Sequence, residues 1–148
     1  MPEHDPRSSE PPTGLQGLLG YRLAEWSEGR AVVELELTPA HLNRAGVVHG
    51  GVLAILLDTA LGYAGCWCGV PGHYRSAVTL SLTTSFTGQA RGRSLRTVAR
   101  KGPGGTRIFT CTGETIGPHG PLRPIVRSNP PRTWPVKLVV SDSVTAER

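Results

Sequence analysis

A single carboxylate stands inside the most apolar stretch of this chain. Residues 52–64 read V-L-A-I-L-L-D-T-A-L-G-Y-A, and Asp58 is the only charged residue among them. A run that is apolar on nearly every side predicts a helix at the centre of a core. Burying an unpartnered carboxylate there would cost several kcal/mol. The chain must therefore fold around this helix and give Asp58 either partners or a function.

One face of the predicted helix combines this carboxylate with small residues: Gly51, Ala54, Asp58, Gly62 and Gly65. Their spacing of three to four residues places them on one side of a helix. A strip without large side chains leaves room for another backbone, or for a ligand, to reach Asp58. The alternative is that the small residues only allow close packing and that Asp58 is a satisfied polar group of the core.

The residues before the helix indicate a binding site for a carbonyl oxygen. His49-Gly50-Gly51 stands where the helix must begin, and the first N–H groups of a helix have no intrahelical acceptor. These groups and the helix dipole can stabilise an oxyanion. Asp58 lies seven residues beyond Gly51, about 10 Å along the axis at 1.5 Å per residue. The spacing therefore favours a composite site, in which either the ligand lies along the strip or a second subunit contributes one half.

These residues form a motif together with their upstream neighbours: Asn43, Gly46, His49, Gly50, Gly51 and Asp58, followed by A-L-G-Y-A. The motif resembles the signature of hotdog-fold acyl-CoA thioesterases, and within them the PaaI-like branch of phenylacetate degradation. The resemblance covers about residues 15–120. It implies an α+β fold in which a curved antiparallel sheet wraps around a long central helix. It also implies a homodimer or homotetramer with active sites at the subunit interface.

The resemblance also implies an activity, the hydrolysis of an acyl- or aryl-CoA thioester to the free acid and coenzyme A. Asp58 would act as general base on a water, or as nucleophile through a mixed anhydride. The N–H groups of Gly50 and Gly51 would bind the thioester oxygen.

Three further residues complete the implied site. Asn43 and His49 would orient the thioester or the leaving group, and Thr79 would help to hold the attacking water or the thioester. Two of them have a plainer interpretation: His49 can be a structural cap of the helix, and Thr79 is a good strand former.

Positive charge gathers in the second half of the chain, where eleven of the sixteen Lys and Arg residues lie after residue 90. We expect Arg93, Arg100 and Lys101 to meet the phosphates of coenzyme A, which enters only as part of the substrate. The alternative is a solvated basic strand face. Binding of nucleic acid is not expected, because no base-stacking aromatic residues are interleaved with these charges.

Composition excludes several other classes of protein. The chain has no run of 18 apolar residues and no signal-like segment, so we expect neither a membrane span nor secretion. Its three cysteines are odd in number and lack metal-ligand spacing, which predicts a cytoplasmic protein without a metal site.

The remaining pattern predicts one domain of about 105 residues between two unlike ends. Residues 1–14 read as a disordered segment and residues 15–120 as the hotdog domain. Within it we expect strands at 15–25, 30–37 and 76–87, and a hairpin of 94–101 with 107–115. The strand at 76–87 should have one apolar face of Val78, Leu80, Leu82 and Phe86. Residues 121–148 form a divergent Pro- and Arg-rich tail with room for one short strand at 136–140.

A second function remains open on the sequence alone. A non-catalytic hotdog module could bind acyl-CoA as a sensor or scaffold. The divergent tail favours this alternative mildly. Members of the resembling family usually end with a further strand in this region, and its loss would weaken the subunit assembly and the activity. The retained Asp58 argues against it. A hotdog dehydratase is disfavoured, because that branch carries its His and acid in contexts other than H-G-G followed by Asp.

Overall fold

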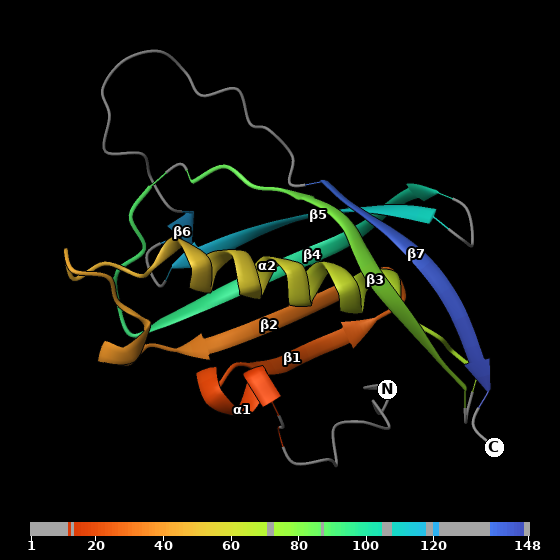
Figure 1. The fold of residues 1–148 in the computed structure, drawn as a ribbon, viewed down its shortest axis with the longest axis horizontal. Coiled ribbons are helices and arrows are strands. Elements are labelled where there is room, and N and C mark those ends of the chain that lie inside the picture. The colour runs from red at the N-terminus through yellow and green to blue at the C-terminus, as the bar shows by residue number, and fades with distance from the viewer. Residues whose placement is uncertain are drawn as a thin grey trace.

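A curved antiparallel sheet wraps around one long helix in this computed structural model (Figure 1). The structure describes residues 12, 14–70, 73–86, 88–104, 108–117, 120–121 and 137–146. Its elements are α1 (Gly14–Leu19), β1 (Arg22–Ser27), β2 (Arg30–Glu36), a 3-10 turn (Pro39–His41), α2 (Gly50–Gly65), β3 (His73–Thr83), β4 (Ser94–Gly104), β5 (Ile108–Gly117), β6 (Gly120–Pro121) and β7 (Lys137–Ala146). None of the described helices is long and apolar enough to cross a membrane.

The order of the strands is β1-β2-β4-β5-β7-β3, with β6 paired to the end of β5. All pairings are antiparallel. The strands β1 and β3 are thus the two edges of the described sheet, and β3 crosses on the side of α2 that the central strands leave open (Figure 1). The predicted helix, the strand at 30–37 and the hairpin at 94–115 are confirmed, with small shifts of their ends.

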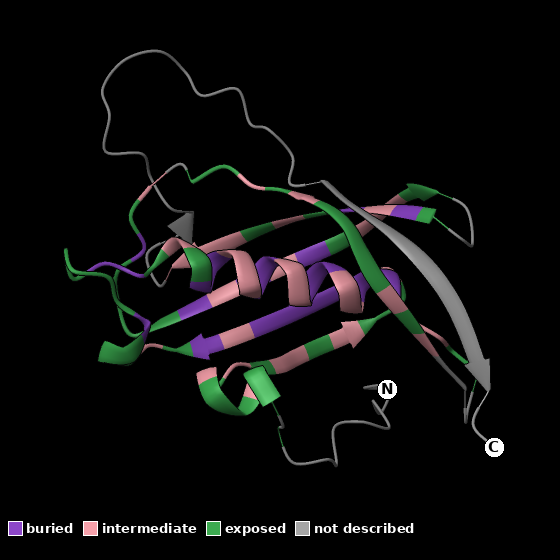
Figure 2. Ribbon diagram, viewed as in Figure 1, coloured by how far each residue is buried: buried purple, intermediate pink, exposed green. Residues whose placement is uncertain are grey.

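The core lies between α2 and the central strands. One side of the helix is buried against β2, β4 and β5, whereas the side turned away from them is only half-buried (Figure 2). Leu56, Ala60 and Leu61 of the helix have no exposed surface, or almost none, and meet Leu35 and Phe109 of the sheet in one apolar cluster. The helix that the sequence predicts to be apolar all round therefore has one open face.

The amphipathic pattern predicted for β3 is partly wrong, because the strand contains a β-bulge. We expected one apolar face of Val78, Leu80, Leu82 and Phe86. Val78, Leu80 and Phe86 are instead 68%, 55% and 56% exposed, and only Leu82 packs against the core. The register with β7 shifts between Thr79 and Ser81. An extra residue in one strand exchanges the faces of all residues beyond it. Ala77 before the bulge and Leu82 beyond it therefore both pack against the core, and Thr79, on the same face as Ala77, reaches the helix.

The chain before β1 is helical where we predicted a strand from residue 15. Leu15, Leu18 and Leu19 have the spacing of a helix, and α1 ends where the Gly20 N–H donates to the Gln16 carbonyl over 2.8 Å. Gly20 takes a φ of 78°, a left-handed conformation that favours glycine at the end of a helix. The predicted disorder of 1–14 lies almost wholly outside the described residues.

The tail contributes a strand of ten residues, twice the length predicted at 136–140. Strand β7 lies between β5 and β3, and its pairing with β3 runs from His73↔Ala146 to Thr83↔Lys137. It therefore joins the edge strand β3 to the rest of the sheet. The long Pro- and Arg-rich segment before it, 122–136, lies outside the described residues.

Candidate active site

The start of α2 is capped by a histidine. His49 has an extended backbone, and its Nδ1 accepts the Gly51 N–H over 2.9 Å. A neutral imidazole that accepts at Nδ1 carries its proton at Nε2, so the exposed ring offers an N–H donor to a ligand. The Gly51 N–H is engaged by this cap, whereas the N–H of Gly50 precedes any intrahelical acceptor. The structural cap that was the alternative for His49 is thus present. The Nε2–H of His49 and the N–H of Gly50 take no part in it.

The loop before the helix is organised by Asn43. Its Oδ1 accepts the N–H groups of Ala45 and Val47, over 2.9 Å and 3.3 Å. Its backbone carbonyl accepts from Gly46, whose φ of 70° suits a residue without Cβ. These contacts shape the path to His49. The role of Asn43 toward a substrate stays a prediction.

The structure brings Asp58 and Thr79 together, and this is the most specific contact of the site. Thr79 Oγ1 on β3 donates to Asp58 Oδ1 on α2 over 2.7 Å. Asp58 is only half-buried, because it lies on the face of the helix that the central strands leave uncovered. The contact holds one carboxylate oxygen in place and leaves the second oxygen available to a water or a substrate.

The strip of small residues is open at Gly62. A Cβ added at Gly62 would meet nothing within 4 Å. Gly65 is different, because a Cβ there would lie 1.7 Å from Cε2 of the buried Phe109. Gly65 therefore packs into the core, and the open strip ends at Gly62. Near that end, Trp26 stacks edge-on with Tyr63 and Trp67 at centroid distances of 5.4 and 5.1 Å, a cluster that the sequence analysis missed.

The helix start and Asp58 remain apart within one chain. They lie on the same helix, and seven residues from Gly51 to Asp58 correspond to about 10 Å. A carbonyl held at the Gly50 N–H could not reach the carboxylate of its own helix unless the ligand lay along the strip. This separation is the one that the spacing in the sequence predicts.

The predicted coenzyme-binding cations lie at two ends of β4. Arg93 immediately precedes the strand, on the side of the helix start, where the Val48 N–H donates to the Ala90 carbonyl. Arg100 and Lys101 lie near its other end, and Lys101 Nζ sits 4.8 Å from the centre of the Phe109 ring. Seven strand residues span about 23 Å. One chain therefore does not bring these three cations together.

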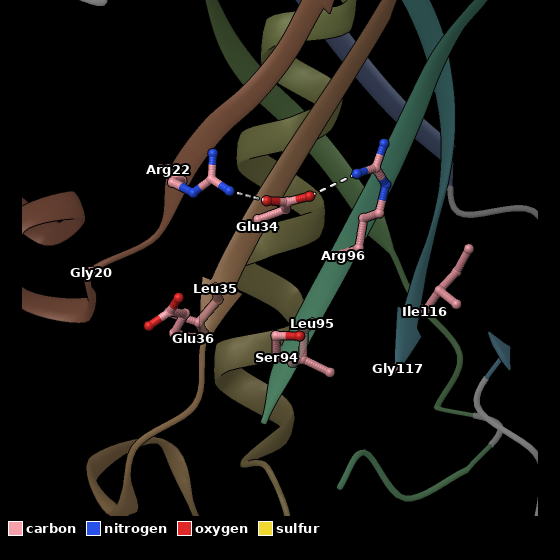
Figure 3. A pocket seen from close by; sticks show the side chains of 10 residues that line it. All are labelled: Gly20, Arg22, Glu34, Leu35, Glu36, Ser94, Leu95, Arg96, Ile116 and Gly117. Carbon is pink, nitrogen blue, oxygen red and sulfur yellow. Dashed lines mark hydrogen bonds and ion pairs between the residues drawn. The ribbon is translucent and has the colours of Figure 1, made fainter. Parts of the chain in front are cut away.

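A separate cavity of about 470 Å³ lies on the outer face of the sheet (Figure 3). It is lined by Gly20, Arg22, Glu34, Leu35, Glu36, Ser94, Leu95, Arg96, Ile116 and Gly117. Glu34 pairs with both arginines, and Arg96 also pairs with Glu25. Hydrogen bonds from Arg30 and Arg96 hold the pKa of Glu25 below its usual range. The cavity contains none of the predicted site residues, and its charges are already balanced.

Metal and thiol chemistry find little support in the described part of the chain. No three His, Cys, Asp or Glu side chains among those residues are grouped so that they could hold a metal ion. Burial raises the pKa of the Cys111 thiol to about 11, so this thiol stays protonated at neutral pH and is a poor nucleophile.

The chain is similar in sequence to known proteins over part of its length. No family model matches the chain. A Pseudomonas aeruginosa protein that is named only provisionally as an esterase is 37% identical over 78 residues, which are 52% of this chain and 57% of that protein. The chain spans about half the length of the curated relatives it matches.

Solved structures extend the likeness over most of the chain. A thioesterase of Haemophilus influenzae superposes with a TM-score of 0.70 at 19% identity, over 86% of this chain and 81% of that one. A Bacillus halodurans protein crystallised with CoA superposes with a TM-score of 0.62 at 25% identity, over 86% and 72%. The fold is therefore the hotdog fold expected from the sequence, and its structural relatives include thioesterases.

Proposed function

We propose that this chain is an acyl-CoA thioesterase, which hydrolyses a thioester to a carboxylic acid and free coenzyme A. The observation that carries the proposal is the 2.7 Å hydrogen bond from Thr79 Oγ1 to Asp58 Oδ1 on the open face of α2. Support for the substrate class comes from the thioesterase among the structural relatives and from the CoA bound by another. The PaaI-like motif favours an aryl-bearing acyl group, and the odd number of cysteines, three, favours the cytoplasm.

The chemistry follows from the atoms at the start of α2 and from the carboxylate of Asp58. The thioester oxygen accepts from the Gly50 N–H at the positive end of α2, which polarises the carbonyl carbon. Asp58 takes a proton from a water that attacks this carbon, or it attacks the carbon itself and forms an anhydride that water then cleaves. The C–S bond breaks, and the thiolate leaves as coenzyme A. We expect the Nε2–H of His49 to orient the thioester or the leaving group.

The separation of these groups favours a site shared between two copies of the chain over a ligand that lies along the strip of one chain. We propose that the helix start of one copy faces Asp58 of the other across a two-fold axis, in a dimer or in a tetramer of such dimers. Strand β3 supports this arrangement, because it carries Thr79, forms an edge of the described sheet, and exposes Val78 and Leu80 on its outer face. An exposed apolar edge strand is a template for pairing with another chain. Of the three predicted coenzyme-binding cations, Arg93 is then the one at the end of β4 nearest the helix start, and Arg100 and Lys101 would contribute only from another copy.

Charge placed on this strand is expected to separate the subunits. The double variant Val78→Lys, Leu80→Lys puts two cations on β3 of each copy, and they would repel their equivalents across a two-fold interface. We expect light scattering at micromolar concentration to give a dimer or tetramer for the native chain and a monomer for the variant, with loss of thioesterase activity. Leu18→Lys on α1 is the matched control, since Leu18 is 80% exposed away from β3. The β3 interface would be excluded if the native chain were a monomer, or if the double variant formed an oligomer of the same mass as the native chain.

The activity itself is tested by thiol release from a panel of aryl-acetyl, aroyl and fatty acyl-CoAs. We expect turnover of at least one of them, with free coenzyme A and the acid formed in equal amounts. Calorimetric titration of the same compounds separates the alternative function. A chain that binds acyl-CoA tightly and releases no thiol from any of them would be a sensor or scaffold and not an enzyme.

A further inference from the structure

The segment that follows β3 brings an aromatic ring onto the start of α2. β3 ends at Thr83, and three residues later the Phe86 ring covers Gly50, with its Cζ 3.5 Å from the position that a Cβ of Gly50 would take. The same chain segment thus meets α2 twice, at Asp58 through Thr79 and at Gly50 through Phe86. The ring is nevertheless 56% exposed. One part of it contacts the helix start, and the remainder is open.

A second observation concerns an unpaired hydroxyl group in the same segment. Thr84 Oγ1 is buried and has no hydrogen-bond partner among the described residues. A buried hydroxyl without a partner costs free energy and calls for an explanation, such as a bound water or a ligand. An unpaired hydroxyl two residues before an open aromatic ring is typical of a surface that another molecule covers.

We propose that Phe86 is a specificity-determining residue that packs against the acyl group of the substrate and favours aryl groups. This inference rests on the proposed function, because the acyl group is positioned by its carbonyl at the Gly50 N–H. The acyl group and the thioester sulfur are both bonded to that carbonyl carbon, so each would begin near the ring that covers Gly50. The pantetheine arm is a poorer match, because its amides need hydrogen-bond partners that a phenyl ring does not supply. An aryl group instead gains both apolar burial and ring-on-ring packing.

The test compares two substrates and three variants. We expect Phe86→Ala to lower kcat/KM for phenylacetyl-CoA by about tenfold, the order expected for loss of an aromatic pair, and for acetyl-CoA by less than about twofold. Phe86→Tyr keeps the ring and should retain the native preference. Ile108→Ala is the matched control, because Ile108 is equally exposed, at 53%, but lies on β5. Melting temperatures of all variants report whether the fold is kept.

A binding measurement keeps this inference separate from the proposed function. Calorimetry with the non-hydrolysable thioether analogues of phenylacetyl-CoA and acetyl-CoA needs no turnover. We expect Phe86→Ala to weaken the phenylacetyl analogue selectively, even if the native chain releases no thiol and the proposed catalysis fails. Equal weakening of both analogues would place Phe86 against the coenzyme, and unchanged binding of both would make it a packing residue only. Either result would overturn the proposal, as would a native chain that binds neither analogue.

Discussion

Asp58→Asn is expected to lower kcat by about 10²-fold or more and to leave KM nearly unchanged. Asn has almost the same shape, and its Oδ1 can still accept from Thr79 Oγ1, so the contact that positions the side chain is retained. The variant loses the lone pair and charge that either abstract a proton or attack the thioester. A group that acts mainly in the transition state affects kcat more than ground-state binding.

Steady-state thiol release with the best substrate of the panel measures this effect. Glu28→Gln is the control, because it removes an exposed carboxylate in the turn between β1 and β2. We expect Asp58→Asn to melt at an equal or higher temperature, since removing a charge from a covered interface relieves its desolvation. Hydrolysis at the native rate by Asp58→Asn would show that the carboxylate is not the catalytic group.

Gly65→Ala is expected to destabilise the fold by about 3 kcal/mol or to prevent folding, an effect at the upper end for overpacking a core. The new Cβ would lie 1.7 Å from Cε2 and 2.3 Å from Cζ of Phe109. The ring cannot move aside easily, because Phe109 is 1% exposed and packed within the main core cluster. Thermal unfolding followed by circular dichroism measures the change, which corresponds to roughly 10 °C for a chain of this size.

A double variant tests whether this clash is the cause. Phe109→Leu removes the ring atoms that the new Cβ would strike, so Gly65→Ala should cost less in that background than in the native one. The difference between the two costs is the coupling free energy of a double-mutant cycle. Equal costs in both backgrounds, or a single variant that melts with the native chain, would contradict the close packing of α2 on β5.

Local periodicity predicts the centre of this fold well. The helix from Gly50 to Gly65, the strand β2 and the β4–β5 hairpin all follow from spacings within the segments themselves. The open strip also follows from the sequence, because small residues at helical spacing leave one side of the helix without large side chains. Gly65 is the exception, since only the packing of Phe109 reveals that it belongs to the core.

The remaining features depend on contacts between distant segments. The bulge at Thr79 is set by the register of β3 on β7, some sixty residues away, and it decides which side chains meet the helix. The full length of β7 was not predicted, because the proline-rich segment before it indicated no more than a short strand. The approach of Phe86 to Gly50 likewise joins two segments that no sequence spacing connects. Pairing of Thr79 with Asp58 could be expected only through the family resemblance, which supplied the strand position.

Subunit exchange between two inactive variants tests the shared site most directly. Asp58→Asn keeps an intact helix start. Gly50→Trp keeps an intact Asp58 but places a bulky side chain at the helix start, where a Cβ alone already contacts the Phe86 ring. Each homodimer alone should be inactive. After mixing and exchange, each heterodimer should contain one complete site, and its activity should approach about half that of the native dimer, as a two-fold interface requires. Absence of recovered thiol release despite demonstrated exchange, or full activity in a monomer, would contradict a site built from two chains.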